Sequence, residues 1–107
     1  MIGGNKTAIL QKKVTSKNQI GESISKWDDV QSLVGFLDLS SGNSQYDTYN
    51  AKIEESTHLF IMDYVPIKET ETDTRLLIDG KPYEITLIDN PMGLNKHIEI
   101  FLKYTGE

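Results

Sequence analysis

The sequence predicts an all-β protein, a small antiparallel β-barrel or sandwich of about five to six strands with a long inserted loop. Apolar and polar residues alternate in several short segments, which is typical of half-buried strands. Turn-forming residues separate these segments, and no segment sustains the 3.6-residue period of an amphipathic helix. Because the chain has 107 residues, we expect residues 1–107 to form one domain.

The first strand is expected over Thr7–Val14, where Ala8, Leu10 and Val14 share one parity. The polar stretch that follows, Thr15–Ser23, contains Asn and Gly and suits a hairpin turn.

A second strand is expected over Ile24–Leu39. Leu33, Leu37 and Leu39 fall on one face, and Gly35 between them indicates a bulge or a close approach of another backbone.

The middle of this strand has an alternative interpretation. A short helical turn over Trp27–Val34 is also compatible with the sequence, with Asp28 or Asp29 as its first residue.

The next 19 residues, from Ser40 to His58, offer few side chains for a core. Loops longer than about 12–15 residues are uncommon in compact domains and are usually functional or disordered. We therefore expect a mobile loop over about 40–57. Its charged residues are Asp47, Lys52, Glu54 and Glu55, which give it a net charge of −2.

The third strand is expected over His58–Val65, which is apolar on both parities and ends before Pro66. Such a strand is buried on both faces, either in a barrel wall or between a core and a neighbour.

The last third of the chain carries the clearest hairpin signal. Two strand-like runs within Thr74–Asp89 are separated by Asp79 and Gly80, which suit a type I′ turn. The inward side chains of the second run are expected to be Tyr83, Ile85 and Leu87.

A final strand is expected over Lys96–Tyr104, after a turn at Asn90–Asn95. Its inward side chains, by alternation, are Ile98, Ile100, Leu102 and Tyr104.

No catalytic residue, cofactor site or metal site is predicted. The absence of cysteine excludes disulfides and thiolate ligands, and His58 and His97 begin separate strands without the spacing of a metal site. Adjacent carboxylates such as Asp28 and Asp29 are typical of solvated surface, and no nucleophile or phosphate-loop motif occurs. We expect a protein that is not an enzyme.

The net charge of −5 argues against sequence-specific nucleic-acid binding, which depends on clusters of basic residues. The basic residues that do cluster, Lys12, Lys13 and Lys17, suit a solvated strand end. An acidic surface can still lie beside DNA that must pass without sticking. The chain has no apolar run of membrane-spanning length and no signal-peptide pattern, so we expect no membrane partner and synthesis in the cytoplasm.

The order of these features resembles the phage head–tail joining family, in particular the head-completion (stopper) proteins of tailed bacteriophages. The resemblance covers Thr7 to Tyr104, and it is carried by Trp27, the polar loop at Ser40–His58, and the segment DGKPYEI followed by an Asn-Pro turn.

This resemblance implies a β-barrel subunit of a ring in the head–tail connector, assembled in the host bacterial cytoplasm and retained in the virion. The implied ring has twelve copies, to match the portal, and lies below the portal and adaptor proteins and above the tail. Phage DNA passes through it without sequence-specific binding. The implied channel or gating loop comprises Ser40, Ser41, Gly42, Asn43, Ser44, Gln45, Tyr46, Asp47, Thr48, Tyr49 and Asn50.

A ring requires a heterologous interface, in which two different patches meet. The doubly apolar third strand supplies Phe60, Met62 and Tyr64 as a possible subunit interface. Two alternatives remain open: a tail-completion or tail-terminator protein, and a small β-barrel module that binds a ligand or nucleic acid.

Overall fold

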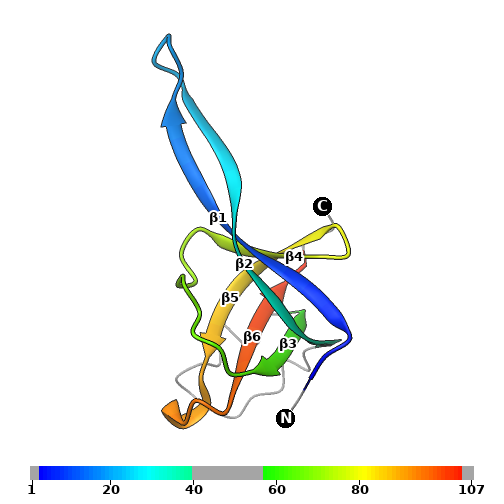
Figure 1. The fold of residues 1–107 in the computed structure, drawn as a ribbon. Helices are drawn as coiled ribbons and strands as arrows, with labels where there is room; N and C mark the ends of the chain where they lie inside the picture. The colour runs from blue at the N-terminus through cyan, green and yellow to red at the C-terminus, as the bar shows by residue number, and fades with distance from the viewer. Residues whose placement is uncertain (1–2, 40–56, 105–107) are drawn as a thin grey trace.

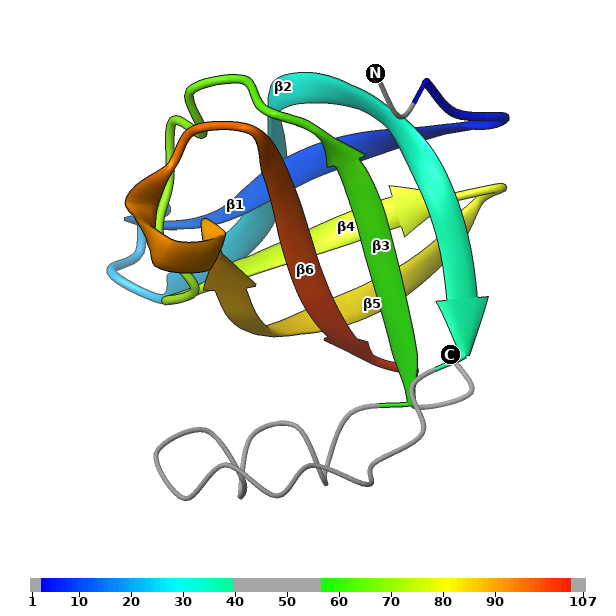
Figure 2. The ribbon, with the colours of Figure 1, turned by 90° about the horizontal axis from the view of Figure 1, so that it is seen from below.

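Six antiparallel strands close into a barrel in the order β1-β2-β3-β6-β5-β4 (Figures 1 and 2). The structure is a computed structural model that describes residues 3–39 and 57–104. The predicted all-β barrel is confirmed. The strands, with one short 3-10 turn (η1), are β1 Lys6–Lys17, β2 Ser23–Leu39, β3 His58–Asp63, β4 Thr74–Ile78, β5 Lys81–Asp89, η1 Pro91–Gly93 and β6 His97–Lys103.

The β1–β2 hairpin is the longest element pair, and its register runs from Lys6↔Gly35 to Lys17↔Ser23. Strand β2 is extended throughout, so the helical alternative for its middle part is wrong. A register shift between Leu10 and Gln11 leaves Val30 as the extra residue of a β-bulge. The hairpin therefore pairs over its whole length, and part of it extends beyond the barrel (Figure 1).

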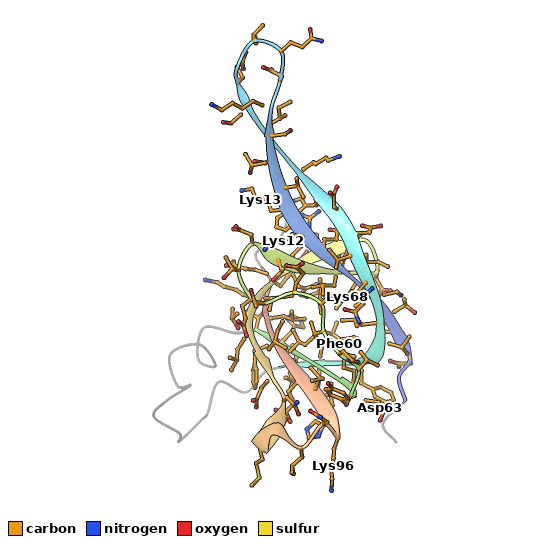
Figure 3. The ribbon with its side chains drawn as sticks, turned by 60° about the vertical axis from the view of Figure 1, so that its left-hand side comes forward. Lys12, Lys13, Phe60, Asp63, Lys68 and Lys96 are labelled. Carbon is orange, nitrogen blue, oxygen red and sulfur yellow. The ribbon has the colours of Figure 1, made fainter. Side chains whose placement is uncertain are left out.

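Side chains from all six strands form the core inside the barrel. Figure 3 labels one of them, Phe60. The predicted inward residues of the last strand are confirmed, since Ile98, Ile100 and Leu102 are buried and Tyr104 packs against them. Leu39 is an exception to the prediction for β2, because its side chain is 74% exposed at the end of the strand.

Gly35 is the predicted point of close approach. A Cβ atom at this position would lie within 3.0 Å of the Ile61 carbonyl oxygen and of the Phe60 ring, whose nearest carbon is at 2.8 Å. Strand β3 can therefore cross β2 closely only because residue 35 has no side chain.

The predicted hairpin at Asp79 and Gly80 is confirmed, with φ of 53° and 77° at these two residues. These positive values match the type I′ turn that the Asp-Gly pair favours. Ile78 and Lys81 are directly paired across the turn.

The alternation predicted for β5 is interrupted. Its register with β6 shifts between Ile85 and Leu87, so Leu87 pairs with Phe101 and Ile88 pairs with Ile100. Ile88 packs against the core in the position that sequence alternation assigned to Leu87. The extra residue of the bulge, Thr86, reverses the parity of everything after it.

Candidate interaction surfaces

Residues 40–56 of the loop predicted to be functional lie outside the described residues, and these include all of its proposed channel residues, 40–50. The structure does place the residues on either side of it. Leu39 ends β2 and pairs directly with His58, which begins β3. The chain therefore leaves and re-enters the barrel at neighbouring points on one end.

The return point of the chain is fixed by polar and aromatic contacts. Thr57 donates its backbone N–H to the Leu102 carbonyl at 2.8 Å, and its hydroxyl accepts the Tyr104 N–H at 2.8 Å. A further hydrogen bond of 2.8 Å joins the Thr57 hydroxyl to Nδ1 of His58. The His58 ring meets Tyr83 and Tyr104 edge-on, at centroid distances of 5.1 and 6.3 Å. His58 thus has a packing role at the barrel end.

The side chains predicted as a subunit interface do not form an outer surface. Phe60 is fully buried and Met62 is 2% exposed, both within the core cluster, and Tyr64 packs against that cluster. This corrects the prediction for Phe60 and Met62, because side chains enclosed by the barrel cannot contact a second subunit. For Tyr64, which is only partly buried, an interface role stays a prediction. The opposite parity of β3, with Leu59 and Ile61, is the half-buried outward one.

An apolar patch that the sequence analysis missed lies on the outside of the barrel. Val34 and Phe36 alternate with buried residues on β2, and they are 52% and 41% exposed. Val65, 37% exposed, lines a shallow cleft together with Val34 and Asp63. We call Val34, Phe36 and Val65 the outer patch. The sequence does carry a pattern that indicates this patch, because the second strand is apolar on both parities around Val34 and Phe36, as the third strand is.

The outer patch borders a seam in the barrel wall. Strand β2 pairs with β3 only from Phe36 to Leu39, and beyond that point a side chain bridges the gap. The Gln31 amide donates to the Pro66 carbonyl at 2.9 Å and accepts from the Lys68 N–H at 3.1 Å. Gln31 thus links β2 to the segment that follows β3, where the pairing of these two strands has ended.

A second outward cluster surrounds Trp27, which the sequence resemblance had singled out. Arg75 of β4 lies over the indole ring at 4.3 Å from its centroid, and its Nε donates to Gln11 at 2.7 Å. Gln11 in turn donates to Asp29 at 2.8 Å. Cation–π stacking and a hydrogen-bonded chain thus join β2, β1 and β4 on the outside of the barrel.

Two carboxylates oppose each other near the end of the barrel that carries η1. Asp89 of β5 pairs directly with Glu99 of β6, and His97 lies 3.1 Å from Glu99. Burial raises the pKa of Asp89 above its ordinary 3.8, the charge of Glu99 raises it further, and His97 partly opposes both effects. Like charges directly opposite each other destabilise a sheet.

Asp89→Asn should therefore stabilise the protein at pH 7 by about 0.5 kcal/mol, since the amide carries no charge to bury beside Glu99. A raised carboxyl pKa makes the native state bind more protons than the unfolded state. The Asp89 contribution to stability is thus fully present below pH 3.8 and is lost as the pH rises through the raised pKa. Thermal unfolding between pH 4 and 7 should show the advantage of the variant shrinking as the pH falls.

Glu22→Gln, at an exposed position in the β1–β2 turn, is the matched control and should leave this pH profile unchanged. An Asp89→Asn variant that is less stable than the wild type at pH 7 would show that the carboxylate makes a net favourable contact instead.

In residues 3–39 and 57–104, no group of three or more His, Cys, Asp or Glu side chains is placed to hold a metal ion. Over the same ranges, no helix has the length and apolar character needed to cross a membrane. The surfaces that the structure does offer are apolar and mixed-charge patches.

Two solved structures share this fold. The solution structure of protein SF1141 from Shigella flexneri 2a aligns with a TM-score of 0.71 at 15% identity, covering 100% of this chain and 97% of that one. A chain from the virion of a native gene transfer agent particle aligns with a TM-score of 0.58 at 12% identity, covering 92% and 91%. No curated protein matches the sequence.

The sequence itself matches a family described as phage head completion protein over residues 4–104, nearly the whole chain and all six strands of the barrel. Proteins of that family are structural components of the virion rather than enzymes. The chain therefore belongs to the phage head completion protein family.

Proposed function

We propose that the chain is a stopper, a ring-forming subunit of the head–tail connector that closes the DNA channel after packaging and presents the surface on which the tail docks. The observation that carries the proposal is the family match over residues 4–104. A related fold in the virion of a gene transfer agent supports a place in an assembled particle.

The proposal includes a ring of twelve copies, an adaptor or portal protein above it, a tail protein below it, and assembly in the bacterial cytoplasm. The net charge of −5 suits a channel that passes DNA without binding its sequence, because phosphate binding needs clustered basic side chains. The channel role of residues 40–50 stays a prediction, since these residues lie outside the described part of the chain.

Deleting the gene from the phage or prophage that encodes the chain tests the proposal, with plasmid-borne wild-type gene as the control. We expect tailless heads that package DNA and then lose it. The measurement is electron microscopy of the particles combined with nuclease-protected DNA. Restoration by the plasmid should return tailed, DNA-retaining particles.

The alternative roles give different particles. Malformed tails on intact, filled heads would overturn the stopper assignment in favour of tail completion. Normal infectious particles lacking the chain would overturn any structural role in the connector.

A further inference from the structure

The β1–β2 hairpin continues past the barrel as a two-stranded arm, Val14–Lys26. Strand β4 pairs with β1 only from Ala8 to Lys12, and the Lys13 N–H makes the last bond on that side, to the Asp73 carbonyl at 2.8 Å. Figures 1 and 3 show the arm projecting from the barrel, and Figure 3 shows Lys12 and Lys13 near its base. Two-stranded hairpins without a third neighbour are marginally stable in water.

The tip of the arm nevertheless has its own hydrogen bonds. The Asn18 side-chain oxygen accepts the N–H groups of Ile20 and Glu22 at 3.1 and 2.9 Å, and the Asn18 carbonyl accepts the Gly21 N–H at 3.1 Å. Gly21 supplies the positive φ, 85°, that this turn requires. The tip is thus a preorganised turn, which lowers the entropy cost of docking.

This turn presents apolar side chains to solvent. Ile20 is 77% exposed at the tip, and Ile24, on the strand beside it, is 50% exposed. The arm also carries Lys17 and Lys26 against the single acid Glu22, a net charge of +1. Since the whole chain has a charge of −5, the remainder carries −6. The arm is therefore a weakly positive, apolar-tipped projection on an acidic protein, in which Lys26 also lies 3.7 Å from Asp28, just outside the arm.

The arm cannot cover the outer patch of its own barrel. Ile24 and Phe36 lie on the same strand, twelve residues apart, which at about 3.3 Å per residue places them up to about 40 Å from each other. The exposed apolar residues of the arm and those of the outer patch thus lie at opposite ends of β2. They cannot contact each other within one copy.

The outer patch matches the arm in chemistry. Its cleft is predominantly apolar and is lined by Gly3, Ser32, Leu33, Val34, Met62, Asp63 and Val65. Asp63 accepts the Gly3 N–H there at 2.8 Å, and the apolar side chains offer contacts for an aliphatic residue such as isoleucine. Glu99 lies in the same row as Phe36, because Phe36 pairs with Ile61 and Ile61 pairs with Glu99. Asp38 is exposed two residues after Phe36 on β2. Together with Asp63 these carboxylates outnumber the one lysine nearby, Lys96, whose carbonyl accepts the Tyr64 N–H. Two unlike patches with complementary polarity and charge are what a heterologous contact requires.

We propose that the arm of one copy docks its Ile20 tip in the outer patch of the next copy, and that this head-to-tail contact links neighbouring subunits. This inference specifies how neighbouring subunits of the proposed ring would touch. It rests on the proposed function only for the closure of these contacts into a ring. The occupant of the patch is a second copy of this chain.

Disulfide trapping tests the contact directly, because the chain has no cysteine of its own. Ile20→Cys and Val34→Cys are purified separately, mixed at high concentration and oxidised. We expect a disulfide-linked dimer in the mixture and only background amounts from either variant alone. Glu84→Cys replaces Val34→Cys in the control mixture, since Glu84 is exposed on β5, opposite β2 in the barrel order.

A mixture that gives no more dimer than the Glu84→Cys control would overturn the arm contact. This result would leave the proposed connector function unaffected. Trapping in particles extends the test: the double variant Ile20→Cys/Val34→Cys should give a ladder of multiples of 12.1 kDa. A cross-linked band of any other mass would show that the arm docks on a different protein, which also overturns the proposal.

Ile20→Lys provides a second readout, with Met92→Lys as the matched control, because Met92 is also a highly exposed apolar residue (91%) and lies in η1, outside the arm and the outer patch. Both variants should unfold at the wild-type temperature, and Ile20→Lys alone should lose incorporation into particles. Normal incorporation of Ile20→Lys would contradict the proposed contact. Absence of the wild-type chain from particles would instead contradict the proposed connector function.

Discussion

Gly35→Ala should lower the free energy of unfolding by about 3 kcal/mol, because overpacking a tight site costs typically 1–3 kcal/mol and more when backbone must move. The added Cβ would meet the Ile61 carbonyl oxygen of β3 and the Phe60 ring on one side of β2. The backbone of Gly4 lies against the Gly35 backbone as well, so the strand has little room to shift away. Denaturant unfolding of the purified chain measures the loss.

Val34→Ala, at the preceding position, is the control for this substitution. Its side chain is 52% exposed, so the change should cost less than about 1 kcal/mol, the span of strand propensities. Equal stabilities of Gly35→Ala and the wild type would show that β2 and β3 can separate without cost at this crossing.

Phe60→Ala should cost about 3–5 kcal/mol, the usual range for removing a fully buried phenylalanine. Phe60 has no exposed surface and lies in the core cluster. The loss should appear in the unfolding of the isolated chain. Phe36→Ala is the matched control, since Phe36 faces outward from the neighbouring strand and is 41% exposed.

The pair of phenylalanine variants distinguishes core from interface. If Phe60 contacted a neighbouring subunit, its replacement would weaken assembly and leave the isolated chain as stable as before, contrary to the structure. The Phe60 ring also lies within 3.0 Å of the position that a Cβ atom at residue 35 would occupy. The double variant Gly35→Ala/Phe60→Ala should therefore lose less stability than the sum of the single losses, because removing the ring relieves part of the clash.

The candidate surfaces were only partly visible in the sequence. Trp27 was singled out only as part of the family resemblance. Its partner Arg75 is 48 positions away and is brought over the ring by the pairing of β1 with β2 and β4. The outer patch was missed because the prediction for the second strand considered only the face that carries Leu33, Leu37 and Leu39, and not the opposite parity with Val34 and Phe36. Deciding which of two apolar parities faces inward requires knowing which neighbours cover each face.

The sequence also did not predict that the β1–β2 hairpin extends beyond the barrel as an arm. The alternation of β1 predicts a strand but does not tell where its third neighbour stops. That boundary is set by β4, which begins only at Thr74. The short polar residues of the hairpin then extend into solvent because no other part of the described chain pairs with them.

The sequence by itself determined the all-β class, the Asp79–Gly80 hairpin and the inward face of the last strand, because turn preference and two-residue alternation act between near neighbours in the chain. Only the tertiary structure decided three other features: Phe60 and Met62 belong to the core, Ile88 replaces Leu87 on the inward side, and the β1–β2 hairpin outgrows the barrel. Each of these depends on a register between strands that are distant in sequence, and a bulge of one residue reverses which side chains face the core.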